Sequence, residues 1–120
     1  MQQDYIKTLS EVGVDVEEGT RRFSGNEALF QKFLVKFLDD DNYMKTEAAI
    51  RDNDYEAVQA GAHTLKGVAG NLAMKTLFNA SNELMMAVRE QDFEKCDEIF
   101  AVVRQSYISI CEAIKTGNLS

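Results

Sequence analysis

Residues 60–74, AGAHTLKGVAGNLAM, contain the side chains of this sequence that are best suited to chemistry. His63 is the single histidine of the chain, and Lys66 follows it at the spacing of about one helical turn. A neutral imidazole is a nucleophile at pH 7, and an ammonium group one turn away can stabilise an anion attached to it. The pair therefore has the chemistry needed to accept a phosphoryl group on His63 and to support its oxygens with Lys66.

A helical wheel predicts that His63 lies on an exposed face. Apolar residues stand on the opposite side of the wheel: Val58, Leu65, Val68 and Leu72. Gly67 and Gly70 fall within about 40° of His63, and Ala60, one turn before it, is also small. A glycine inside a helix costs about 1 kcal/mol relative to alanine. We interpret the two glycines as cleared space through which a partner reaches the imidazole, whereas Gly61 faces inward, where close helix packing explains it.

The elements that position this segment are predicted to be helices throughout. The chain has 120 residues, of which 45% are hydrophobic and 28% charged, and it contains no proline. The patterns predict short helices up to Ser10 and over 15–23, then longer helices over 27–52, 54–73, 76–90 and 92–116. The expected core face of the 27–52 helix is Leu29, Phe30, Phe33, Leu34, Phe37 and Leu38. A local break at the acidic run 39–41 stays open, Asn26 and either Asn53 or Asp54 are expected caps, and Gly117 is expected in a left-handed position that ends the last helix.

Four long helices with short polar connections favour an all-α, antiparallel up-and-down four-helix bundle. We expect one domain over residues 1–120, with short N-terminal helices over 1–25 lying across a bundle formed by 26–117. Cys96 and Cys111 lie roughly 22 Å apart on one helix, so we expect reduced core residues rather than a disulfide. Their spacing from His63 matches no familiar zinc site.

The formal net charge of −7 argues against nucleic acid and anionic membrane surfaces as partners. No secretory signal and no apolar run of about 18 residues is present, so we expect a cytoplasmic, monomeric protein. A start at Met and an end soon after the last helix favour a free-standing protein over an excised domain.

The stretch AHTLKGVAGNLAM resembles the His-x-x-Lys-Gly signature of histidine-containing phosphotransfer (HPt) domains. The upstream VDVEEGTRRFSGNEALFQKFLVKF is similar to the segment that leads into many bacterial members, so the resemblance covers most of the chain. It implies that His63 is the phosphorylated residue, that Lys66 supports the phosphoryl group and that Gly67 admits the partner. Asn71 and Leu72 match the continuing pattern.

Two positions depart from that pattern. Members often have glycine where Ala73 stands, and often have Glu or Gln where this chain has Met85. Arg89 matches a position that is sometimes basic in the family.

We expect the partner to dock on an apolar patch around His63. Met74 and one of Met85 and Met86 are the candidates for this patch, and of that adjacent pair one is expected in the core and the other on the surface. The full set of expected partner-binding residues is Ala60, Gly70, Met74, Met85 and Arg89, of which Arg89 would contribute charge.

The function implied by the resemblance is a relay. A receiver domain, or a hybrid sensor histidine kinase that carries one, donates a phosphoryl group from an aspartate to His63, which passes it to another receiver. The chain would need no cofactor, because the receiver supplies Mg²⁺, and it would not be an enzyme by itself.

Two alternatives stay open on the residues alone. One is a non-catalytic helical interaction module, in which the glycine face is a groove for another helix. The other is a small hydrolase with His63 as general base, although its candidate second groups, Ser81, Asp92 and Cys96, lie on other helices without an orienting pattern.

Overall fold

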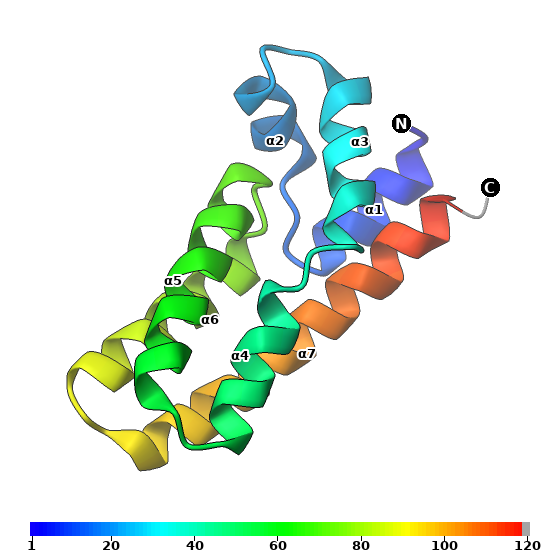
Figure 1. Cartoon of the computed structure of the whole chain (residues 1–120). Helices are drawn as coiled ribbons and strands as arrows, with labels where there is room; N and C mark the ends of the chain where they lie inside the picture. The colour runs from blue at the N-terminus through cyan, green and yellow to red at the C-terminus, as the bar shows by residue number, and fades with distance from the viewer. Residues whose placement is uncertain (119–120) are drawn as a thin grey trace.

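Seven helices make up the part of the chain that this computed structural model describes, residues 1–118 (Figure 1). They are α1 (Gln3–Glu11), α2 (Val16–Arg22), α3 (Glu27–Phe37), α4 (Asn42–Arg51), α5 (Tyr55–Asn71), α6 (Lys75–Arg89) and α7 (Phe93–Asn118). No β-strand occurs within residues 1–118. The prediction of an all-α chain is confirmed.

Polar caps begin four of the helices. Asp15, Asn26, Asp54 and Asp92 each accept a hydrogen bond from the backbone N–H three residues later, at 3.0–3.2 Å. Each bond satisfies an amide that has no partner within its own helix, which stabilises the helix by about 1 kcal/mol. The predicted cap Asn26 is confirmed, and the choice left open between Asn53 and Asp54 falls on Asp54.

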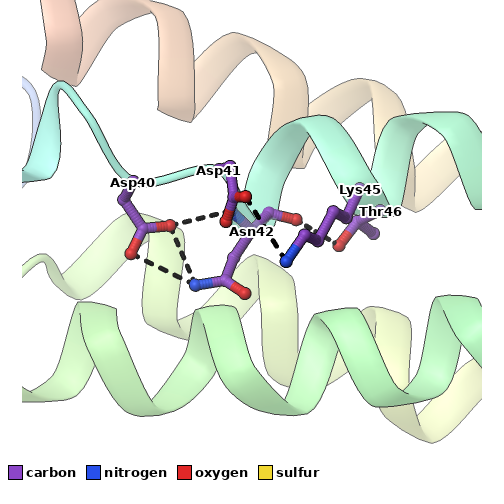
Figure 2. A network of polar contacts seen from close by, with 5 residues as sticks. All are labelled: Asp40, Asp41, Asn42, Lys45 and Thr46. Carbon is purple, nitrogen blue, oxygen red and sulfur yellow. Dashed lines mark hydrogen bonds and ion pairs between the residues drawn. The ribbon is translucent and has the colours of Figure 1, made fainter.

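The prediction of one continuous helix over 27–52 is wrong, and the local break left open at the acidic run is confirmed, because α3 ends at Phe37 and α4 begins at Asn42. Asp40 accepts hydrogen bonds from both the backbone and the side-chain nitrogen of Asn42, at 2.9 Å each (Figure 2). This local bond replaces the helical one and starts a new helix, to which Lys45 adds an ion pair with Asp41 at 3.3 Å.

The bundle is built from antiparallel neighbours. In Figure 1 the chain descends through α3 and α4, ascends through α5, descends through α6 and ascends through α7. α5 packs between α4 and α6, and α6 packs on α7. The interior holds large, fully buried side chains from most of these helices: Phe30, Leu34, Leu65, Leu77, Leu84 and Ile110.

The predicted core face of α3 is too wide. Phe30, Leu34 and Phe37 are buried as expected, but the side chains of Leu29 and Phe33 are 37% and 38% exposed. They flank the buried stripe and are only partly covered, Phe33 by the ring of Phe23 at 5.2 Å.

The end of α7 also differs from the prediction. Gly117 does not terminate the helix in a left-handed conformation, since α7 continues to Asn118. Instead the ring of Tyr5 occupies the space where a side chain at 117 would stand. The Tyr5 hydroxyl donates a hydrogen bond to the Ile114 carbonyl at 3.0 Å, so α1 is attached to the last turns of α7.

A short backbone pairing covers the turn between α5 and α6. Asp15 N–H donates to the Ala73 carbonyl at 2.9 Å, and Lys75 N–H donates to the Gly13 carbonyl at 2.7 Å. Gly13 has φ of +88°, which glycine adopts at little cost. Met74 lies in this pairing, opposite Val14, and is 0% exposed.

α5 ends sharply despite the departure at Ala73. The Met74 N–H donates to the Ala69 carbonyl at 2.9 Å and the Ala73 N–H to the Gly70 carbonyl at 3.3 Å, the two bonds of a Schellman motif. Ala73 takes the left-handed conformation at φ +54°, where glycine is the usual residue.

The two cysteines are free, with Cys96 buried and Cys111 partly buried. None of the described helices is long and apolar enough to cross a membrane.

Candidate functional site

His63 projects from the middle of α5 into solvent. The helix buries the opposite side against the bundle through Val58, Ala62, Leu65 and Ala69. Within residues 1–118, no group forms a hydrogen bond or an ion pair with the imidazole. The predicted exposure of His63 is confirmed, and both ring nitrogens are free to react or to bind.

The glycines of α5 have three different environments. A Cβ at Gly67 would meet no atom within 4 Å, so this position is open, as predicted. Gly61 faces Thr46 of α4, and a Cβ there would collide with the threonine hydroxyl, which confirms the inward, close-packed role. Gly70 differs from the prediction, since a Cβ there would lie 3.3 Å from the ring of Phe78. A ring from α6, and not open space, explains that glycine.

Lys66 lies beside Phe78 as well. Its Nζ is 5.6 Å from the centroid of the Phe78 ring, on a half-buried lysine side chain. No carboxylate in the described chain lies within 4 Å of this ammonium group. The charge of Lys66 is therefore available to an anion on the His63 face of α5.

The predicted docking residues divide into two groups. Ala60 on α5 is exposed, and Arg89 is exposed at the opposite end of α6 from Phe78. Met74 and Met85 are only 0% and 4% exposed, so the expectation that they line a docking surface is wrong.

Each of these two methionines is buried for a tertiary reason. Met74 lies beneath the pairing of residues 13–15 with the α5–α6 turn, and Met85 faces inward because α6 is covered by both α5 and α7. Met86 is 41% exposed, so the expectation that one of the pair is in the core and the other on the surface is confirmed.

Sequence reasoning missed an apolar pocket beside the exposed strip of α5. It has a volume of about 410 Å³. Residues from the α2–α3 turn and the end of α5 line it: Arg22, Phe23, Phe33, Val68, Asn71 and Leu72. The rings of Phe23 and Phe33 lie 5.2 Å apart at its edge. The phenylalanines were visible in the sequence, but their place next to α5 depends on how α2 and α3 fold across its end.

The groups required by the hydrolase alternative do not surround His63. Ser81 and Cys96 are both 0% exposed inside the bundle, and Asp92 caps α7. The described residues also contain no cluster of three or more His, Cys, Asp or Glu side chains able to hold a metal ion.

The described chain is an all-α bundle in which His63 is exposed to solvent and Lys66, one turn later, has no ion pair. Such a helical domain can carry an anionic group on its histidine. Comparison with family models places the chain more narrowly: the Hpt domain model matches residues 29–114, so this chain belongs to the Hpt domain family. Hpt domains are phosphocarrier modules of two-component signalling that interact with receiver domains and kinases. The match spans most of the chain from α3 into α7 and includes His63, Lys66 and Gly67. No curated protein and no solved structure matches the chain.

Proposed function

We propose that this chain is a phosphotransfer intermediate that takes a phosphoryl group from a receiver aspartate, or from a hybrid kinase, onto His63 and passes it to a second receiver. The observation that carries the proposal is the pairing of an exposed, unbonded His63 with the open backbone at Gly67. A phosphoryl group and its donor both need that space, because the attacking nitrogen must approach the phosphorus in line with the leaving oxygen.

The transfer exchanges one bond for another. An imidazole nitrogen of His63 donates its lone pair to phosphorus, the N–P bond forms, and the P–O bond to the donor aspartate breaks. The aspartate leaves as a carboxylate, and the reverse steps load the next receiver. Lys66 supplies positive charge to the phosphoryl oxygens, which carry most of the charge in the transition state.

The chain acts in this scheme as a carrier and not as an independent enzyme. We assign Mg²⁺ to the receiver, whose carboxylates hold it, and no resident cofactor to this chain. The chain would work as one monomeric domain over residues 1–120, with the bundle of 26–117 presenting the site.

We assign the receiver-docking surface to the exposed strip of α5 and the apolar pocket that continues from it. Ala60, His63 and Gly67 form the strip, and Phe33 and Val68 belong to the pocket. Asn71, one turn after Gly67, continues the strip along the same side of α5 and lines the pocket, roughly 12 Å along the helix axis from His63. A receiver that covers both the imidazole and Asn71 would reach the exposed part of the Phe33 ring.

Radioactive phosphoryl transfer tests the proposal. Receiver domains encoded beside the gene are phosphorylated with a labelled acyl phosphate in Mg²⁺, freed of the donor, and mixed with this chain. We expect label on the chain that is lost in acid and stable in alkali, and that is absent from His63→Gln. Label that persists in His63→Gln would refute His63 as the acceptor.

The same experiment separates the proposal from the interaction-module alternative. A module that only binds would associate with receivers without acquiring label, and His63→Gln would bind them as well as the unmodified chain.

A further inference from the structure

Phe78 of α6 connects two residues of the His63 face of α5. Its ring stands against Gly70, where a Cβ would lie 3.3 Å from Cδ2 and 3.4 Å from Cε2. The same ring lies 5.6 Å from the ammonium nitrogen of Lys66. Gly70, Phe78 and Lys66 thus form a contiguous group on the His63 side of α5.

We propose that Phe78 is a positioning residue, which holds the Lys66 ammonium on the His63 side of α5 where it can support a phosphoryl group. The inference rests on the proposed function and extends it to a residue outside the His-x-x-Lys-Gly stretch. Gly70 falls within about 40° of His63 around the helix, so a ring seated on Gly70 marks the His63 side. Lys66 lies between these two positions along the axis, and its cation is attracted to the ring face.

An aromatic ring suits this task better than a carboxylate would. A carboxylate beside Lys66 would neutralise its charge and compete with the phosphoryl oxygens. A ring face restricts the flexible four-carbon side chain and leaves the charge unneutralised. The described chain follows this pattern, since no carboxylate in it lies within 4 Å of the Lys66 ammonium group.

Gly70 acquires a reason within this arrangement. A Cβ at 70 would lie closer to the Phe78 ring than an ordinary van der Waals contact, so the ring would have to shift by a few tenths of an ångström from its place against Gly70 and Lys66. The glycine therefore serves contact with α6, whereas Gly67 serves access from solvent.

The first test is spectroscopic and needs no phosphoryl group. In the unphosphorylated chain, the Lys66 methylene protons next to Nζ should show an upfield ring-current shift in the NMR spectrum. Phe78→Leu should abolish this shift, and Phe78→Tyr, which keeps the ring, should preserve it. An unshifted Lys66 in the unmodified chain would overturn the proposal.

The second test measures how fast His63 is labelled by phosphoramidate, a small donor that removes any effect of receiver docking. The donor P–N bond breaks as the imidazole N–P bond forms, and ammonia leaves. We expect Phe78→Leu to slow labelling about two- to fivefold, the effect of losing a cation–π contact at a partly exposed site. Phe78→Tyr should restore the rate, and Phe78→Leu should have no further effect when Lys66→Ala is already present.

Phe93→Leu is the matched control, because Phe93 is a 39% exposed phenylalanine at the start of α7. Its labelling rate should equal that of the unmodified chain. An equal or faster rate in Phe78→Leu, or an effect that persists in the Lys66→Ala background, would overturn the positioning role alone. A chain that takes no label from phosphoramidate or from receivers would end the proposed function and this inference together.

Discussion

Gly61 of α5 and Thr46 of α4 lie in direct contact, and the threonine hydroxyl occupies the space that a Cβ at position 61 would need. Thr46 is fully buried, and its hydroxyl donates a hydrogen bond to the Asn42 carbonyl at 2.8 Å. The hydroxyl is therefore held both by its own helix and by the close approach of α5. This contact makes the glycine at 61 structural, in contrast to the open glycine at 67.

Gly61→Ala should lower the free energy of unfolding by about 1–3 kcal/mol, because the new methyl group must displace Thr46 or separate α4 from α5. Urea denaturation followed by circular dichroism measures the change. The double variant Gly61→Ala/Thr46→Ala should lose less than the sum of the two single variants, since removal of the hydroxyl makes room for the methyl. Simple additivity would contradict the contact.

Gly67→Ala should have the opposite effect on stability. The position is exposed with no neighbouring atom, so alanine adds about 1 kcal/mol of helix propensity without a clash. The same methyl obstructs the approach to His63, and transfer from a phosphorylated receiver should slow on the order of tenfold. Urea denaturation and initial transfer rates measure the two effects, and a variant that is both more stable and equally fast would remove the access role of Gly67.

Phe33→Ser should weaken receiver binding. It should also lower the free energy of unfolding, because the partly covered ring packs against Phe23, so binding is measured at a temperature where the variant is fully folded. The Phe33 ring is 38% exposed beside the pocket, so docking can bury apolar area that the serine lacks, a loss of roughly 1 kcal/mol or about fivefold in Kd. Val102→Ser on α7 is the control, because Val102 is 57% exposed and lies outside the proposed surface. Isothermal titration with a receiver compares them, and equal affinities for both variants would exclude the pocket from the interface.

Met85→Gln and Met86→Gln should differ in stability although they are adjacent. The amide at 85 would be buried without an assigned partner, which costs about 1–3 kcal/mol. The amide at 86 would reach water, and its effect should lie within about 0.5 kcal/mol. Thermal unfolding of the two variants measures the difference, and a stable Met85→Gln would mean that a hydrogen-bond acceptor for position 85 exists within reach.

Alkaline pH should destabilise the fold, in part through Tyr107. Burial, followed by nearby Cys111 and Asp40, raises the pKa of Tyr107 above its ordinary value of 10.0. Above about pH 10 the unfolded chain loses the phenolic proton while the folded chain keeps it, so the free energy of unfolding falls as pH rises. Urea denaturation at pH 8 and again above about pH 10 measures this loss of unfolding free energy. The loss between the two pH values should be smaller in Tyr107→Phe than in the unmodified chain. An unchanged slope would assign the alkaline loss to other groups, such as Tyr5 and Tyr43, whose pKa values burial also raises.

Local sequence determined much of this protein. The caps at Asn26 and Asp54 and the outward direction of His63 follow from hydrogen-bonding side chains and from a period of 3.6 residues, both of which act within one or two turns. The break between α3 and α4 has a local cause too, in the bonding of Asp40 to Asn42. The apolar pattern on both sides of it nevertheless suggested one continuous helix.

The surroundings of the site were decided only by tertiary structure. Met74 is buried because residues 13–15 pair with the α5–α6 turn, and Gly70 is occupied because α6 brings Phe78 onto it. Phe33 stays 38% exposed because the ring of Phe23 covers only part of that flank of α3. A helical wheel states which side of a helix a residue faces, but whether another segment covers that side depends on contacts between residues far apart in the chain.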